Sequence, residues 1–476
     1  MNRQISHIFG LVIVLFAVLV GASTWWSVVR AEELTNDTTN QRPLLEEQRI
    51  PRGLITATDG TRLAESRPEG SGASRRFVRT YPEGSVFSHA IGYSFVDRGR
   101  SGLEKSRNDE LTGQENEFTS IVDELSGTAL EGDDIRLTLD PAAQRSAIAA
   151  LGGQTGSIVA IEPATGRIRA MVSQPDFDPN EIPTRFAELN RAEGSPIFNR
   201  ATQARYPPGS TMKVVTAAAA IDSGKFTPES LVDGTSGQEI GGLPLSNFGA
   251  QDFGPTTLTD ALTNSVNTVW AQVGEQIGTR TYFDYMDRFG FSEDPPVDYP
   301  AEQLTPSGVF EGNKLLKGGD AVDVGRVAIG QERLQVTPLQ MAMVAAAVAN
   351  KGTLMEPQFV ERVTSRDGRV RERVEPDEYE RVMKESTAAA VTAMMSRVVE
   401  EGSGTAAALS GIPVAGKTGT AEVDGGASNQ AWFIAFAPVK DPKIAIAVTV
   451  ERTQSTGGLV AAPIAKTVLQ ELLSGG

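Results

Sequence analysis

The sequence contains a serine and a lysine at a spacing that suits a nucleophile and its base. Ser210 and Lys213 stand directly after the turn-forming run Pro207-Pro208-Gly209 and open the apolar run Val214–Ile221. That run predicts a buried helix, which would bring the two side chains to one face, a turn apart. A serine hydroxyl needs a base to remove its proton, and a lysine whose ammonium form is destabilised can serve.

Histidine is the more usual base for a serine nucleophile, but the chain contains only His7 and His89. His7 stands beside an apolar run and His89 lies far upstream of Ser210, so lysine is the better candidate. Ser-x-x-Lys alone is weak evidence, because helices often begin with a serine cap followed by a solvated lysine. Further motifs must decide between these interpretations.

Two later motifs could complete a catalytic site. Ser265-Val266-Asn267 is a small polar triplet in an apolar helical stretch, where buried polar groups need hydrogen-bond partners. Lys417-Thr418-Gly419-Thr420 offers a cation, hydroxyl groups and a glycine that permits close approach, which suits an anionic substrate edge. Alone, the first is equally typical of a turn between helices and the second of an exposed edge strand guarded by lysine. Ser106-Arg107-Asn108 also fits Ser-x-Asn but precedes the nucleophile.

Ser-x-x-Lys, Ser-x-Asn and Lys-Thr-Gly, in this order, are the signature of serine acyltransferases that react with penicillin. On these motifs the chain resembles the class B penicillin-binding proteins, monofunctional D,D-transpeptidases of bacterial cell walls, and in particular their actinobacterial penicillin-binding protein A type. The resemblance covers essentially the whole chain and includes Arg52-Gly53-x-Ile55, Gly102-Leu103-Glu104, Tyr206-Pro207-Pro208-Gly209-Ser210, Gly330-Gln331, Thr337-Pro338-Leu339-Gln340 and Lys417-Thr418-Gly419-Thr420-Ala421-Glu422.

The resemblance implies a role for each residue of the first two motifs. Ser210 would attack the carbonyl of the penultimate D-alanine of a stem peptide and release the terminal D-alanine. Lys213 would take the serine proton, and Ser265 would relay a proton to the leaving amine. Asn267 would hold Lys213 and the substrate amide in place. An amine from a neighbouring stem peptide would then attack the acyl-enzyme and form the crosslink.

The resemblance also implies that the third motif binds the substrate. Lys417 would supply positive charge that keeps the pKa of the base lysine low. Thr418 and Thr420 would grip the substrate carboxylate, and Gly419 would let the substrate approach the backbone. The backbone N–H groups of the nucleophile and of Thr420 would form an oxyanion hole, a contribution of about 3–4 kcal/mol. β-Lactams would acylate the nucleophile because they mimic the D-Ala-D-Ala end, and no cofactor or metal is implied.

Composition excludes several other classes of protein. The chain has 476 residues, 40% of them hydrophobic, which is enough for two or three domains with a sizeable core. It has no cysteine, so disulfides, zinc–thiolate sites, iron–sulfur clusters and thiol catalysis are excluded. The net charge of −16 and the pI near 4.8 argue against a nucleic-acid partner.

The chain is predicted to consist of three parts. The apolar run Ile8–Val29 can span a bilayer and exceeds the roughly 7–15 apolar residues of a cleavable signal peptide, which is the alternative. We therefore predict that residues 1–30 form a cytoplasmic tip and a single membrane anchor, with everything after it outside the cell. Residues 31–132 are predicted as a β-rich, non-catalytic pedestal or partner domain that begins with an acidic stalk, and residues 133–476 as the transpeptidase domain.

The predicted fold class is α+β, with a central antiparallel sheet flanked by helices as in β-lactamases and transpeptidases. Alternating apolar residues predict the sheet from two hairpins, one near each end of the catalytic domain. Residues 156–172 and 430–450 are predicted to form these hairpins, while 105–111, 141–151, 258–286, 338–349 and 460–473 are predicted as helical.

Alternatives to a transpeptidase include a β-lactamase, a D,D-carboxypeptidase and a division scaffold. A β-lactamase would need Glu-x-x-Leu-Asn after Ser-x-Asn, whereas Glu188-Leu189-Asn190 precedes Ser210. A D,D-carboxypeptidase, which uses water as the acceptor, shares all three motifs, and a division scaffold is the non-enzymatic alternative. The expected partners are stem peptides, β-lactams, the membrane, and proteins of a division or elongation complex that include a glycosyltransferase.

Overall fold

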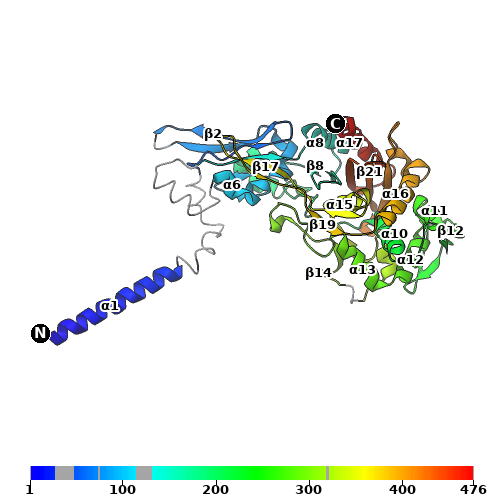
Figure 1. The fold of residues 1–476 in the computed structure, drawn as a ribbon, viewed down its shortest axis with the longest axis horizontal. Coiled ribbons are helices and arrows are strands. Elements are labelled where there is room, and N and C mark those ends of the chain that lie inside the picture. Colours follow the sequence, from blue (N-terminus) through cyan, green and yellow to red (C-terminus); the bar gives the residue numbers. More distant parts are fainter. Residues whose placement is uncertain are drawn as a thin grey trace.

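The computed structural model describes residues 2–26, 30, 48–72, 75–113, 131–317 and 321–474. Figure 1 shows helix α1 (Asn2–Thr24) apart from a folded body whose N-terminal strands lie at the end nearer α1. Within α1, Ile5–Thr24 is long and apolar enough to cross a membrane, and none of it is buried in the protein. Residues 27–29 of the predicted anchor and most of the predicted stalk lie outside the described residues.

The two predicted hairpins form one antiparallel sheet at the centre of the catalytic part. Strands β7 (Gly156–Ile161) and β8 (Ile168–Gln174) come from one hairpin, and β21 (Ser428–Ala437) and β22 (Ile444–Thr453) from the other. Strand β20 (Ala415–Val423) carries Lys-Thr-Gly and forms the edge in the order β20-β21-β22-β7-β8. The predicted α+β fold with a central antiparallel sheet is therefore confirmed.

Helices cover both faces of this sheet. Helices α8 (Pro141–Leu151) and α17 (Ala461–Ser474) pack on one face, and α15 (Pro338–Ala349) packs on the other (Figure 1). Side chains alternate along β7, so Ile158 is buried with the first pair of helices and Val159 with α15. The sheet is thus buried on both sides, and its open edge at β20 is left for the site.

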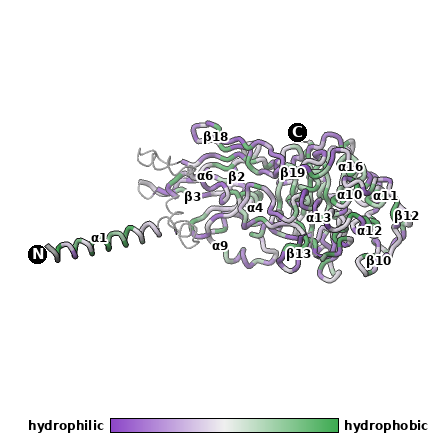
Figure 2. The backbone as a smooth tube through the Cα atoms, turned by 60° about the horizontal axis from the view of Figure 1, so that its bottom comes forward, coloured by the Kyte–Doolittle hydropathy of each residue, from purple (hydrophilic) through white to green (hydrophobic). Residues whose placement is uncertain are grey.

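A block of helices lies between the two halves of the sheet in sequence. It consists of α10 (Lys213–Asp222), α11 (Leu258–Thr263), α12 (Asn267–Ile277), α13 (Thr279–Arg288) and α16 (Glu385–Glu400). The stretch 258–286, predicted as helical, is therefore divided into three helices. Figure 2 shows hydrophobic stretches around α10 and α12 inside the body and polar ones on β18 and β3.

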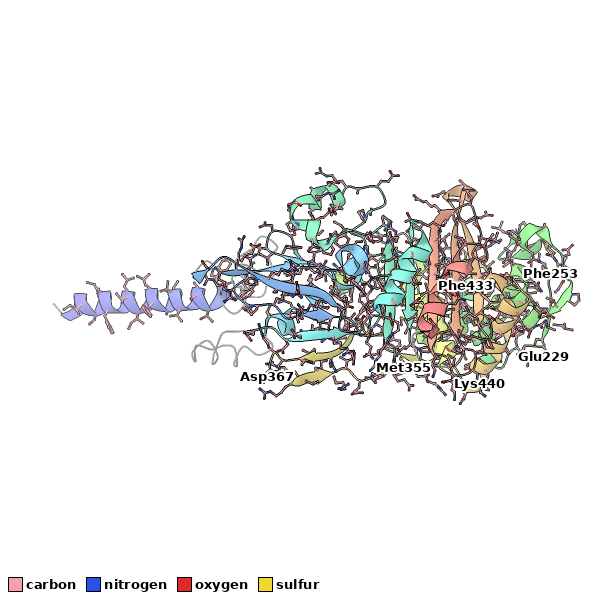
Figure 3. All side chains as sticks on the ribbon, turned by 90° about the horizontal axis from the view of Figure 1, so that it is seen from above. Glu229, Phe253, Met355, Asp367, Phe433 and Lys440 are labelled. Carbon is pink, nitrogen blue, oxygen red and sulfur yellow. The ribbon has the colours of Figure 1, made fainter. Side chains whose placement is uncertain are left out.

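A small lobe, residues 231–257, projects from this block. Strand β9 (Leu231–Asp233) pairs with β12 (Pro255–Thr257), and β10 (Gln238–Ile240) pairs with β11 (Leu243–Leu245). Figure 3 places Phe253 of this lobe at the end of the body far from α1, with Asp367 at the end near α1. The loop between β11 and β12 borders the site described below.

The N-terminal strands form a second sheet together with strands from much later in the chain. Its order is β18 (Val370–Arg373), β17 (Val360–Thr364), β6 (Asp134–Leu137), β1 (Ile55–Thr56), β2 (Arg62–Glu69) and β3 (Arg76–Thr80). Strands assigned by sequence to the catalytic part thus complete a sheet begun by the N-terminal part. The boundary between residues 132 and 133 stays a prediction, because the sheet crosses it.

Shorter elements connect these parts: α4 (Ser88–Ile91), β4 (Ser94–Phe95), β5 (Gly99–Arg100), α5 (Leu103–Ser106), α6 (Asn108–Thr112), α9 (Ile182–Leu189), β13 (Gly308–Glu311), β14 (Lys314–Leu315), α14 (Val324–Ala328), β15 (Leu334–Gln335), β16 (Thr353–Met355) and β19 (Glu378–Arg381). The stretch 105–111, predicted as helical, is divided between α5 and α6, because the backbone leaves the helical conformation at Arg107 (φ −112°, ψ 31°). The guanidinium of Arg107 instead pairs with Asp298 of the catalytic part at 3.2 Å.

A buried ion pair explains two of the N-terminal motifs. Glu104 is fully buried and accepts from Arg52 and Arg79, each at 2.6 Å. Burial acts to raise the pKa of Glu104, but the two guanidiniums outweigh it and hold the pKa below its usual value. Loss of this carboxylate would remove the counter-ion that Arg52 and Arg79 share in the interior, a change that costs about 3–5 kcal/mol in buried pairs.

Candidate active site

The Ser210 turn is positioned by glycines that allow backbones to pack closely. Gly209 has φ 53°, and a Cβ there would lie 2.7 Å from the carbonyl oxygen of Thr420. Its N–H donates to Gly330 O at 3.0 Å, and a Cβ on Gly330 would lie 1.9 Å from Gly209 O. The turn Gly209–Met212 runs directly into α10. Ser210 is thereby held between the edge strand β20 and the segment that contains Gly330.

Lys213 lies at the start of α10 and is completely buried. Its Nζ donates to Ser265 O at 2.8 Å, to Ser265 Oγ at 3.2 Å and to Asn267 Oδ1 at 2.7 Å. Burial lowers the pKa of Lys213 well below its usual value, and the positive charge of Lys417 is the second cause of this shift. The alternative of a solvated lysine behind a helix cap is therefore wrong.

The Ser-x-Asn triplet forms the turn between α11 and α12. Ser265 has φ 57°, a left-handed conformation that is unfavourable for a residue other than glycine and that is retained most often at functional sites. Asn267 is the first residue of α12, and its Nδ2 donates to Ser246 O at 3.1 Å. The amide of Asn267 therefore joins Lys213 on one side to the small lobe on the other.

Lys417 points inward from the edge strand and is also completely buried. Its Nζ donates to Ser265 Oγ at 2.9 Å and to Thr418 O at 3.0 Å. Burial lowers the pKa of Lys417 to about 7. A lysine placed on an edge strand to deter aggregation would be exposed, so that alternative is wrong. The Ser265 hydroxyl instead lies between the amines of Lys417 and Lys213.

The β20 edge provides hydroxyl groups beside the nucleophile. Thr418 Oγ1 lies 2.6 Å from Ser403 Oγ, and Thr420 Oγ1 accepts from Gly457 N at 3.1 Å. A Cβ on Gly419 would lie 2.7 Å from Pro208 O, so glycine lets the nucleophile turn pack against the strand. A cavity of about 210 Å³ opens here and is lined by Ser210, Phe248, Asn264, Ser265, Asn267, Ile329, Gln331, Ser403, Thr418, Thr420, Thr456 and Gly458.

The structure brings together all eight residues predicted from the sequence. The cavity is lined by Ser210, Ser265, Asn267, Thr418 and Thr420, while Lys213, Lys417 and Gly419 lie behind its wall. Sequence reasoning gave no role to Ser403, Phe248 or Thr456, which also line it. The Ser-x-Asn match at residues 106–108 lies in the N-terminal part and does not line the cavity.

The arrangement supports acyl transfer to serine. A hydroxyl at the cavity wall, a buried lysine with a lowered pKa behind it and a hydroxyl relay between two lysines supply a nucleophile, a base and a proton path. Hydroxyl groups along an edge strand suit a peptide substrate that lies beside that strand. The fold and the site together therefore define a serine acyltransferase of the penicillin-reactive class.

Comparison with known proteins places the chain in a family. The description "Penicillin binding protein transpeptidase domain" matches residues 156–470, and "Penicillin binding protein A dimerisation domain" matches residues 52–135. The chain therefore belongs to the penicillin-binding protein transpeptidase family.

Relatives of known name and structure extend over the same length. The peptidoglycan D,D-transpeptidase PbpA of Mycolicibacterium smegmatis is 33% identical over 507 residues, and that of Mycobacterium tuberculosis is 32% identical over 503; both alignments cover 100% of each chain. The structure of penicillin-binding protein A from M. tuberculosis as a ceftriaxone acyl-enzyme is similar with a TM-score of 0.81 and 31% identity, and the match covers 90% of this chain and 100% of that one.

Proposed function

We propose that the chain crosslinks peptidoglycan through an acyl-enzyme on Ser210. Its family makes it a serine-type D,D-transpeptidase and a target of β-lactams. The observation that carries the residue assignment is the buried chain of contacts from Lys213 through Ser265 to Lys417. Such a chain lets a proton leave the nucleophile and reach the leaving group without bulk water.

Acylation begins with the Ser210 hydroxyl. Its oxygen attacks the carbonyl carbon of the penultimate D-alanine while its proton passes to the neutral amine of Lys213. The hydrogen bonds of Lys213 run to Ser265 and Asn267 in this structure and fix the amine, which comes one helical turn after Ser210. Because burial lowers the pKa of Lys213, the amine can be neutral at a pH where an exposed lysine is charged.

The Ser265 hydroxyl then returns the proton to the leaving group. It accepts from Lys213 and Lys417, at 3.2 Å and 2.9 Å, and so can pass a proton from the first lysine to the departing D-alanine amine. The C–N bond breaks as that amine is protonated, and the acyl group remains on Ser210 as an ester. Lys417 supplies positive charge that disfavours prolonged protonation of Lys213.

The β20 edge binds the carboxylate end of the substrate and the developing oxyanion. Thr418 and Thr420 present hydroxyl groups to the carboxylate, and Ser403 orients Thr418 through their 2.6 Å contact. The backbone N–H groups of Ser210 and Thr420 stabilise the oxyanion, which is consistent with the close approach of Gly209 to the Thr420 backbone. An acceptor amine then attacks the ester carbonyl, forms the crosslink and releases Ser210.

The test follows both possible fates of the acyl group. The purified protein is incubated with a peptide ending in D-Ala-D-Ala and with a second, amine-bearing stem peptide, and products are identified by mass spectrometry. We expect release of D-alanine and a crosslinked product whose yield rises with acceptor concentration. Release of D-alanine with only the shortened peptide as product, at every acceptor concentration, would identify a D,D-carboxypeptidase instead. A protein that releases no D-alanine would support the scaffold alternative.

We further propose that residues 1–30 anchor the chain with its N-terminus in the cytoplasm, that residues 31–132 are a partner-binding pedestal and that residues 133–476 act outside the cell. The apolar α1 and the family matches to 52–135 and 156–470 support this three-part organisation.

Neither matched description is a glycosyltransferase, so the matched regions need glycan strands that another enzyme makes. We therefore place the chain in a cell-division complex with such an enzyme. Depletion in the host should give cells that elongate without dividing; loss of shape with normal septa would contradict this role.

A further inference from the structure

Phe248 is exposed in an unusual place for a large apolar side chain. It is 83% exposed, yet it lines both the cavity that contains Ser210 and a larger adjoining cavity of about 780 Å³. Asn267, Gln331, Thr420 and Thr456 line both cavities as well, so the two form one continuous cleft. Phe248 lies where the cavity that contains Ser210 meets the larger cavity, so a ligand that occupies both can cover its exposed ring.

The loop that carries Phe248 is held firmly to the catalytic machinery. Asn247 is 4% exposed; its Nδ2 donates to Gly234 O at 2.8 Å and to Gln251 O at 3.0 Å. Its Oδ1 accepts from Thr268 N at 3.0 Å, one residue after Asn267. The neighbouring Ser246 O accepts directly from Asn267 Nδ2 at 3.1 Å. Phe248 is therefore presented by an anchored loop, at a fixed place relative to the base.

The edge strand gives the direction in which a substrate would lie across this cleft. Side chains at 418, 420 and 422 share one face of β20, at about 6.6 Å intervals. In the proposed function the substrate carboxylate lies at the hydroxyl groups of Thr418 and Thr420, and the oxygen of the scissile carbonyl lies at the backbone N–H of Thr420. The part of the donor before the scissile bond then extends toward Glu422, which lines only the larger cavity. Phe248 borders this route where it leaves Ser210.

We propose that Phe248 is a specificity-determining residue that packs on the acyl side of the donor, against the apolar atoms of the side chain just before the scissile residue. This inference rests on the proposed function, because it takes the donor's orientation from it. In a penicillin the acyl substituent on the 6-amino group occupies the same place. Ile329 of the smaller cavity and Leu334 of the larger one are almost fully buried, and most other lining side chains are polar, so Phe248 offers the large exposed apolar contact along this route.

The test compares two β-lactams that differ only in that substituent. Acylation of the full chain by benzylpenicillin, which has a phenylacetyl group, and by 6-aminopenicillanic acid, which has none, is followed by intact mass over time. In Phe248→Ala we expect the second-order rate with benzylpenicillin to fall about tenfold, since burial of much of an aromatic ring is lost. The rate with 6-aminopenicillanic acid should change less than about twofold, because that ligand has no group to cover Phe248.

A matched control is available in the same lobe. Leu243 is 61% exposed and lines neither cavity, so Leu243→Ala should leave both rates unchanged. Phe248→Leu should retain part of the selectivity, and thermal unfolding of all variants should match the wild type because both side chains are exposed. Equal loss with both β-lactams, or no loss with either, would overturn the proposal. Wild type that is acylated by neither ligand would instead contradict the proposed function.

Discussion

Ser210→Ala is expected to abolish covalent capture of benzylpenicillin, with a fall in the acylation rate of at least about 10⁴-fold. Alanine removes the one protein atom that bonds to the substrate carbon in the proposed mechanism. The Lys213–Ser265–Lys417 contacts do not include the Ser210 hydroxyl, so they should persist in the variant. The cavity should therefore keep its shape and still bind β-lactams without reacting.

Intact-mass spectrometry distinguishes binding from bond formation in this experiment. Wild type should gain the mass of one benzylpenicillin, and Ser210→Ala should gain none. Ser396→Ala is a suitable control, because the Ser396 hydroxyl donates to Thr392 O on α16 and does not line the cavity. A stable adduct on Ser210→Ala would assign the nucleophile elsewhere. Rapid turnover of the drug by wild type would instead indicate a β-lactamase.

Local sequence signals were sufficient for the central sheet and its helices. Helix α8 shows why, since Asp140 accepts from the backbone N–H groups of Ala142 and Ala143, and Pro141 stands in the first turn where its missing N–H costs nothing. The hairpin β7–β8 likewise follows from alternating apolar residues on both sides of a short turn. Such features depend on residues close together in the chain, so a sequence pattern can report them.

The pairing of the N-terminal strands with strands from later in the chain had no such signal. Strand β6 is paired in parallel with β1 and antiparallel with β17, whose residues follow it by more than 200 positions, as in the pair Val363–Ile135. Pairing over this separation leaves no periodicity in a local window. The break between α5 and α6 also involves a distant segment, because Arg107 leaves the helix where it contacts Asp298.

The residues of the site likewise fall into two groups: those in sequence motifs, and those that only the fold brings to the cavity. The three motifs were identifiable because chemistry restricts the residue types and their order, and the structure brings their residues to one cavity. Ser403 belongs to no motif, and its contact with Thr418 depends on the fold of the chain after α16. The place of Phe248 at the cavity could not be predicted from the sequence either, because the role of an exposed aromatic side chain in a polar loop depends on its neighbours in space.

Lys213→Met is expected to lower the rate of acylation by benzylpenicillin at least about 10³-fold at neutral pH while leaving Ser210 in place. Methionine fills a similar volume but cannot accept a proton. In wild type the neutral amine is the active form, so the rate should fall as acidification protonates Lys213. Because burial and Lys417 lower that pKa, the fall should lie well below the pH at which an exposed lysine titrates. A retained rate, or an unchanged acid limb, would remove Lys213 as the base.

The same substitution should change how stability depends on pH. Unfolding exposes Lys213, whose pKa then returns to the ordinary 10.5, so between its lowered pKa in the folded state and 10.5 the unfolded chain binds a proton that the folded chain does not. Stability of the wild type should therefore rise with pH from the lowered pKa of Lys213 toward 10.5, by up to about 1.4 kcal/mol per pH unit for this group. In Lys213→Met this contribution disappears, and denaturant unfolding at several pH values would show a shallower rise in stability with pH.

Lys351→Met is the control for this experiment. Lys351 is 73% exposed, so this variant should keep the wild-type slope of stability against pH. Equal slopes in wild type and Lys213→Met would mean that Lys213 is charged in the folded protein, and a charged amine cannot accept the serine proton.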